Sequence, residues 1–240
     1  MKLRATSLLV VGLVVVCTHT CKRQEPKLLE TRVTSFEFRG TDFNRGGAPN
    51  RFPGGIGEAA VKLARASRVP ICFESISEGT DGTPYPVDIV NKDSTVAIIL
   101  NQMIRKDPRY EFRERLGVVE LRPVGGAEDT QSCLNMTIPI FRISYPWTIA
   151  FASLRCQIKN VAESKFSLVV DPMREGCSGR FTAYRPTSEK AIHATFVVEP
   201  VRDILDRIVA EAGDAAWTAH YSKPTRTCDS LIISAYQVEE

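Results

Sequence analysis

Residues 87–104, VDIVNKDSTVAIILNQMI, decide the fold because their hydrophobic period changes halfway along. The first residues alternate between apolar and polar, as in a strand that is buried on one face. Asp93 or Ser94 can then cap a helix, since both side chains accept hydrogen bonds from a first helical turn. The apolar positions of this helix recur at helical spacing: Val96, Ile99, Leu100, Met103 and Ile104. Asp107-Pro108 ends the helix, and the strand period returns directly afterwards.

The same pattern returns in AIHATFVVEPVRDILDRIVAEAG, which starts at Ala191. The apolar stripe that begins at Val96 has a counterpart that begins at Val201, 105 residues later. Its apolar positions are Val201, Ile204, Leu205, Ile208 and Val209. Pro200 stands where a first helical position tolerates proline, and Gly213 follows the last apolar residue, where helices commonly end. The sequence therefore predicts a repeated strand-helix-strand unit.

The repeat extends upstream in both halves of the chain. A strand, a helix and a second strand are predicted at 32–40, 56–64 and 69–74, and again at 137–144, 151–158 and 165–170. We therefore expect an α+β fold of two tandem modules, residues 31–123 and 134–238, joined by a linker at 124–133. Each module has the order strand-helix-strand, strand-helix-strand-strand. We expect the helices of each module to pack on a small mixed sheet of their own.

This arrangement resembles a known family. A strand, a short polar capping stretch, the pattern V-x-x-I-L-x-x-I (Val201 to Ile208) and a further strand are similar to the short N-terminal domains of bacterial secretins and TonB-dependent receptors. Stand-alone periplasmic proteins of the same type also exist. The resemblance covers nearly all of residues 31–123 and, more loosely, 134–238. It implies small α+β modules that act by docking to other cell-envelope proteins.

The first 20 residues, MKLRATSLLVVGLVVVCTHT, have the basic tip, apolar run and small polar end of an export signal. A short buried helix is the alternative interpretation of this run. Cys21 is a candidate lipidation site, although Thr20 is not the small residue that a lipobox prefers, and cleavage after Thr20 without lipidation is the rival outcome. We expect an exported bacterial protein of the periplasm or outer envelope, whose one contact with membrane is a lipid anchor if Cys21 is lipidated.

An exported chain can keep disulfide bonds. The candidate disulfide cysteines are Cys133, Cys156, Cys177 and Cys228. Their spacing leaves the pairing open, and buried unpaired thiols are the alternative, since free cysteine is among the most buried residue types.

Few residues point to chemistry. A formal net charge of +3 lacks the basic excess of nucleic-acid binders, so we expect no nucleic-acid partner. Beyond the signal only His193 and His220 remain, without metal-ligand spacing. The glycines of FPGGIGEAA (52–60) lack the remaining residues of a phosphate loop and are better explained as a flexible helix entry. We therefore predict no catalytic residue, no cofactor site and no metal site.

The leading functional hypothesis is a non-enzymatic binding or adaptor protein that docks to another cell-envelope protein or to a small ligand. Small sheets leave edges whose unpaired N–H and C=O groups a partner strand can complete. The alternative is a periplasmic hydrolase that uses a pair of acids drawn from Glu58, Glu74 and Asp88. The alternating charges Arg109, Glu111 and Arg113 are expected to mark a solvated strand face, and Asp203 and Arg207 to form an exposed helical pair.

Overall fold

The computed structural model describes residues 27–40, 55–76, 87–163, 191–221, 228 and 231–238. The first half contains η1 (Leu28–Glu30), β1 (Arg32–Arg39), α1 (Ile56–Ser67), β2 (Ile71–Glu74), β3 (Asp88–Thr95), α2 (Val96–Lys106), β4 (Tyr110–Arg115) and β5 (Val118–Pro123). The second half contains η3 (Cys133–Asn135), β6 (Thr137–Pro146), α3 (Trp147–Ala162), β7 (Ala191–Pro200), α4 (Val201–Ala212), β8 (Ala215–Tyr221) and β9 (Leu231–Gln237). The predicted α+β fold is confirmed. The strand expected at 165–170 lies outside the described residues.

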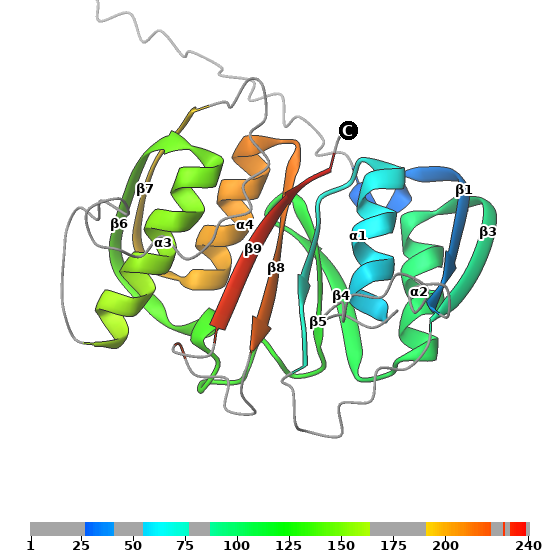
Figure 1. Cartoon of the computed structure of the whole chain (residues 1–240), viewed down its shortest axis with the longest axis horizontal. Coiled ribbons are helices and arrows are strands. Elements are labelled where there is room, and N and C mark those ends of the chain that lie inside the picture. The colour runs from blue at the N-terminus through cyan, green and yellow to red at the C-terminus, as the bar shows by residue number, and fades with distance from the viewer. Residues whose placement is uncertain are drawn as a thin grey trace, which may run out of the picture.

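Layers of sheet and helix alternate across the molecule (Figure 1). The central layer is a mixed sheet with the strand order β4-β5-β2-β8-β9, and the outer layers are the antiparallel pairs β1-β3 and β6-β7. Helices α1 and α2 lie between the central sheet and β1-β3, on the right of Figure 1. Helices α3 and α4 lie between the central sheet and β6-β7, on the left. Each pair of helices is thus covered by sheet on both sides.

The expectation that each half forms a separate sheet of its own is wrong. Strand β2 of the first half pairs in parallel with β8 of the second half, with Phe73 opposite Thr218 and Glu74 opposite Ala219. Since β2 also pairs in parallel with β5, one sheet runs across both halves. Hydrophobic patterning could not reveal this pairing, because a strand buried on both faces carries no mark of its neighbour. All four residues of β2 are buried.

Several local features nevertheless recur at an offset of 105 residues. Helix α2 starts at Val96 and α4 at Val201. Three residues before each helix, Asp93 and Val198 have positive φ angles of 48° and 54°. The short turns η1 and η3 precede β1 and β6 in the same way. These features occupy equivalent positions in the two halves of the chain.

The two halves are turned over relative to each other. Strand β4 is antiparallel to β5, whereas β5, β2 and β8 are parallel, so the matching strands β4 and β8 run in opposite directions. A half-turn about an axis that lies in the sheet and runs across the strands reverses the strand direction and keeps the strand order. Such a half-turn also exchanges the two faces of the sheet. Accordingly Phe73 and Thr218 face the α1 side, while their neighbours Glu74 and Trp217 bond to side chains of α4. The helices of the second half therefore lie on the far side of β8 and β9 from α1.

The predicted apolar stripes form the core. The buried apolar positions on the two matching helices are Val96, Ile99, Leu100 and Met103 on α2 and Val201, Ile204, Leu205, Ile208 and Val209 on α4. Ile104 is only partly buried. This burial explains why both segments are helical, since most helical stability in proteins comes from packing an apolar face.

The ends of these helices differ slightly from the prediction. Thr95, rather than Asp93 or Ser94, caps α2, and its Oγ1 accepts a hydrogen bond from the first turn at 3.4 Å. Strand β3 continues through the polar residues as far as this cap. Pro200 immediately precedes α4 rather than forming its first residue. Gly213 ends α4 with a φ of 85°, as predicted.

Candidate binding pocket between the two halves

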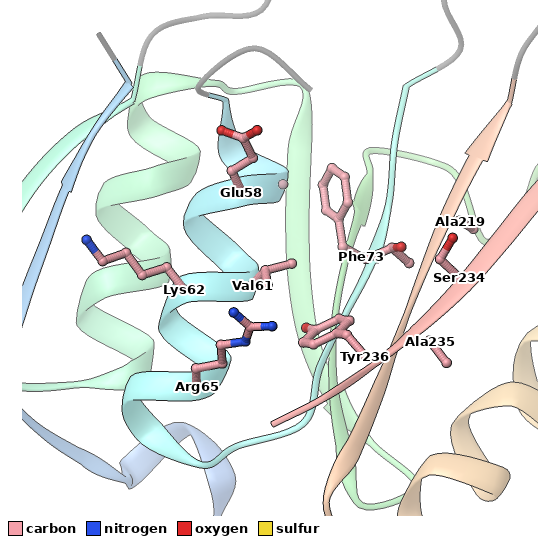
Figure 2. A pocket seen from close by; sticks show the side chains of 11 residues that line it. Glu58, Val61, Lys62, Arg65, Phe73, Ala219, Ser234, Ala235 and Tyr236 are labelled. Carbon is pink, nitrogen blue, oxygen red and sulfur yellow. The ribbon is translucent and has the colours of Figure 1, made fainter. Parts of the chain in front are cut away.

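A pocket of about 530 Å³ lies between α1 and the face of the sheet formed by β2, β8 and β9. Figure 2 shows that α1 forms one wall and the strands of the second half form the other. The pocket exists because the second half is turned over. Its helices cover the opposite face of β8 and β9, so α1 of the first half borders this face.

Helix α1 contributes an apolar residue between two charged ones. Glu58, Val61 and Arg65 line the pocket. They are three and four residues apart and therefore lie on one side of the helix. Figure 2 shows Val61 directed toward the strands, with Glu58 near one end of the pocket and Arg65 near the other. Lys62 also belongs to the lining, but its ammonium group points away from the strands, so the wall that faces them is apolar in the middle and charged at its ends.

A glycine allows α1 to pack closely on β2. A Cβ atom added at Gly57 would lie 2.5 Å from Cε1 of Phe73, far inside van der Waals contact. The Phe73 ring therefore occupies the space that a side chain at this position would need. The same ring stacks on Tyr110, with the ring centroids 5.5 Å apart. Phe73 is held between helix and sheet and gives the pocket a rigid aromatic wall.

Tyr236 closes the pocket on the side of β9. Its hydroxyl donates a hydrogen bond of 2.5 Å to the backbone oxygen of Ile71 and so connects β9 to β2. Burial raises the pKa of Tyr236 well above its usual value. The side chain is therefore neutral at physiological pH, and its ring serves as an apolar surface with a satisfied hydroxyl.

The opposite face of the same sheet carries a buried charged network. Arg202 of α4 donates to Glu74 of β2 at 2.7 Å, and both side chains are almost fully buried. On β5, Glu120 accepts a 2.6 Å hydrogen bond from Arg113. The contact between Arg202 and Glu74 joins a strand of the first half to a helix of the second. Because charged groups are costly to bury without partners, the network favours this one arrangement of the halves.

Two carboxyl groups of this network are coupled. Burial and the nearby charge of Glu120 raise the pKa of Asp206 well above its usual value. Burial alone would raise the pKa of Glu120, but hydrogen bonds from Asp206 and Arg113 outweigh it and lower that pKa. A proton shared by the pair therefore resides on Asp206 in preference to Glu120. Trp217 donates a hydrogen bond of 2.9 Å to Oδ1 of Asp206, which fixes this carboxyl group against β8.

The predicted linker at 124–133 is anchored to the same network. The side-chain amide of Asn135 donates to the backbone oxygens of Gly126 and Asp129, both at 2.8 Å. Its oxygen accepts a 3.2 Å hydrogen bond from Arg202. The connection between the halves is therefore tied to the helix that contacts β2.

The structure corrects two interpretations of surface charge. The strand face of Arg113 is only partly solvated, because Arg113, with a side-chain exposure of 38%, pairs with Glu120, which is 1% exposed. Asp203 and Arg207 do not form the expected pair with each other. Asp203 pairs with Arg115 at 2.7 Å, and Arg207 pairs with Glu199 at 2.6 Å. The contact of Asp203 with Arg115 joins the two halves, so it could not be expected while each half was treated as a separate sheet.

The three acids considered for a hydrolase take different roles. Of Glu58, Glu74 and Asp88, the pocket lining includes Glu58 alone. Glu74 is fully buried in its ion pair with Arg202 on the other face of β2. Asp88 lies on β3 in an outer sheet and accepts a hydrogen bond from the backbone of Gly40.

Two of the candidate disulfide cysteines, whose pairing the sequence left open, are bonded to each other. Cys133 of η3 is bonded to Cys228, which precedes β9. Cys156 of α3 is also disulfide-bonded. Cys21 and Cys177 lie outside the described residues. Cys72 of β2 is a buried free thiol, and burial raises its pKa well above the usual value.

Two serine-histidine contacts were not anticipated. Ser75 Oγ lies 2.9 Å from Nδ1 of His220, and Ser144 Oγ lies 2.8 Å from Nδ1 of His193. The lining of the pocket does not include Ser75 or His220, although both follow pocket residues on β2 and β8.

Sequence reasoning also missed most of the pocket. Val61 and Arg65 lie outside the buried apolar positions of α1, and nothing in the sequence around Tyr236 marks it as a site residue. The signal available was Val61, an apolar residue on the otherwise polar side of α1. It could not indicate what lies opposite, because that surface comes from strands more than 150 residues away.

In the described ranges, no three His, Cys, Asp or Glu side chains are grouped as metal ligands. No helix in those ranges combines the length and apolar character needed to cross a membrane. No protein-family model, no curated protein and no solved structure matches this chain.

Proposed function

We propose that this chain is an exported, non-enzymatic binding protein that holds a small, mainly apolar ligand in the pocket between its two halves. The pocket itself is the observation that carries the proposal. Its volume of about 530 Å³ falls in the usual range of ligand sites. It is walled by aromatic and aliphatic side chains and lies at a junction of two structural units, which is a preferred place for such sites.

The contents of the lining favour binding over catalysis. Acid-base catalysis needs two suitably placed groups in one cleft. Of the three acids proposed for the hydrolase alternative, only Glu58 lines this pocket, and the Tyr236 hydroxyl is engaged with the Ile71 backbone. Cys228 is in a disulfide bond and therefore offers no thiolate nucleophile. The disulfide also supports export, because such bonds persist in oxidising compartments.

A neutral apolar dye tests the proposal. We expect N-phenylnaphthylamine to bind the mature chain with a rise in fluorescence. Ser234→Trp places a large side chain on a lining residue of β9 and should abolish the signal. Ile232→Trp is the matched control, since Ile232 lies on the same strand face but outside the lining. Absence of binding to the wild-type chain, or equal binding by both variants, would refute the pocket as a ligand site.

Docking to another envelope protein is a second candidate function, supported by the edge strand β4. Among the described strands, β4 pairs only with β5 and lies at the end of the central sheet. Its counterpart β8 starts 105 residues later, and the outer edge of β8 is completed by β2 in parallel. The equivalent edge in the second half, that of β8, therefore already pairs with an extended strand, β2. A strand of a partner protein could pair with the edge of β4 in a similar way.

Site-specific photocrosslinking in cells tests this second function. A photoreactive amino acid at Glu111, which is 40% exposed on β4, should form one reproducible adduct with an envelope protein. The same group at Glu37, which is 54% exposed on β1, is the control and should not form that adduct. Identical adducts from both positions would exclude specific docking at β4.

A further inference from the structure

We propose that the pocket selects apolar molecules that carry a single carboxylate, and that Arg65 of α1 binds this group. The inference rests on the proposed function and specifies the class of ligand. Three observations carry it: the apolar walls of the pocket, the opposite charges at the two ends of its α1 wall, and the position of the Arg65 guanidinium.

The charges on α1 give the pocket one negative end and one positive end. Glu58 and Arg65 are seven residues apart, which corresponds to about 10 Å along a helix. Val61 lies between them and faces the strands in Figure 2. The nearby Lys62 also belongs to the lining, but Figure 2 shows its ammonium group directed away from Val61 and the strands. The cation that faces the pocket is therefore Arg65.

Arg65 is suited to a carboxylate beside an apolar surface. Its guanidinium points toward the Tyr236 ring in Figure 2. Its positive charge partly offsets the rise in the pKa of Tyr236 that burial causes. A guanidinium has five N–H donors and can bind a carboxylate in addition to its contacts within the protein. Hydrogen bonds between charged groups are stronger than hydrogen bonds between neutral groups.

Neither the dipole of α1 nor Glu58 attracts an anion, so the affinity for a carboxylate depends on Arg65. Arg65 lies in the last turn of the helix, where the helix dipole is negative and gives an anion no support. Glu58 repels an anion at the opposite end of the pocket. An elongated carboxylate should therefore bind with its head at Arg65 and its apolar chain along Val61 and Phe73.

Competition experiments separate the head group from the apolar chain. Dodecanoate, dodecanol and dodecyltrimethylammonium share one chain and differ in charge. Each would displace N-phenylnaphthylamine from the mature chain, below its micelle concentration. We expect dodecanoate to bind about tenfold more tightly than dodecanol, the effect of one charge-assisted hydrogen bond. The cationic compound should bind more weakly than either.

Two matched variants identify the side chain that binds the carboxylate. Arg65→Gln should reduce the affinity for dodecanoate to that for dodecanol and leave dodecanol binding unchanged. Lys62→Gln removes a neighbouring charge of the same sign and should keep the preference. Melting curves would show that both variants fold, as expected for two exposed side chains.

The outcomes distinguish this inference from the proposed function. If the wild-type chain binds neither the dye nor any of the three compounds, the pocket is not a ligand site and both proposals fail. If all three compounds bind equally well, the pocket binds apolar ligands but the carboxylate selection is wrong. A preference for dodecanoate that survives Arg65→Gln would also overturn the role of Arg65.

Discussion

Arg202 and Glu74 form an ion pair of 2.7 Å that joins the second half of the chain to the first, with side-chain exposures of 3% and 0%. Arg202 comes from α4 and Glu74 from the end of β2, the strand that pairs with β8. The pair therefore lies where the continuous sheet passes from one half to the other. On the opposite face of this sheet, Phe73 lines the pocket.

Loss of one partner in this pair should be costly. Arg202→Met leaves Glu74 buried without its cation, so we expect a loss of about 3–5 kcal/mol in the free energy of unfolding, measured by urea denaturation. The double variant Arg202→Met/Glu74→Leu should regain much of this loss. Arg207→Met breaks a more exposed pair with Glu199 and should cost about 1 kcal/mol or less. Equal losses in the two arginine variants would contradict the assignment.

The coupled carboxyl groups predict a pH effect. Because folding raises the pKa of Asp206, its favourable contribution to stability is complete below its usual value of 3.8 and declines as the pH rises. Asp206→Asn keeps a neutral side chain that can accept from Trp217 and donate to Glu120. The stability of the variant relative to wild type should therefore increase with pH above 3.8. Denaturation curves across the pH range would test this, and a constant difference would refute the prediction.

Close packing of α1 on β2 can be tested at Gly57. Gly57→Ala places a methyl group where the Phe73 ring lies, so we expect a loss of about 1–3 kcal/mol in unfolding free energy. Phe73→Leu also destabilises alone, but the double variant should be more stable than the sum of the two effects predicts. Additive effects in this cycle would mean that the two residues do not touch.

Val198 predicts a stabilising substitution. A β-branched residue with a φ of 54° is strained, and the side chain is 68% exposed, so little packing is lost with it. Val198→Gly should raise the free energy of unfolding by about 1 kcal/mol. Asp93→Gly, at the matching position of the first half, should gain less because aspartate tolerates this conformation better. Thermal melting of both variants would measure the difference.

The Cys133–Cys228 disulfide should stabilise the second half strongly. It closes a segment with a sequence separation of 95 residues, for which the chain-entropy account gives about 4–5 kcal/mol. The variant Cys133→Ser/Cys228→Ser should unfold at a correspondingly lower urea concentration. Serine replacement is preferable to a reducing agent, since Cys156 also takes part in a disulfide bond. An unchanged midpoint would show that this bond constrains little.

The sequence predicted the elements well where one local period repeats. The stripes beginning at Val96 and Val201 are both helices with buried apolar faces, and Gly213 ends the second of them as expected. The capping residue of α2 was placed one or two residues early, because Asp93, Ser94 and Thr95 can all cap a helix and the local pattern does not choose among them.

The candidate site could not be predicted in the same way. Arg65 and Tyr236 lie in different halves, and nothing in their local sequence brings them together. The charged strand at Arg113 was assigned to solvent because a polar alternation looks the same whether water or a charged helix covers it. Tertiary contacts decide between these cases.

By itself the amino-acid sequence determined which segments are helices and strands, their repeated order and the faces that they bury. These properties depend on side-chain periods and capping residues within about 20 positions of each other. The tertiary structure alone decided that the halves share one sheet, that one half is turned over, and that a pocket forms between them. The pairing of β2 with β8 depends on backbone hydrogen bonds, which any strand offers, so side-chain patterns do not specify it.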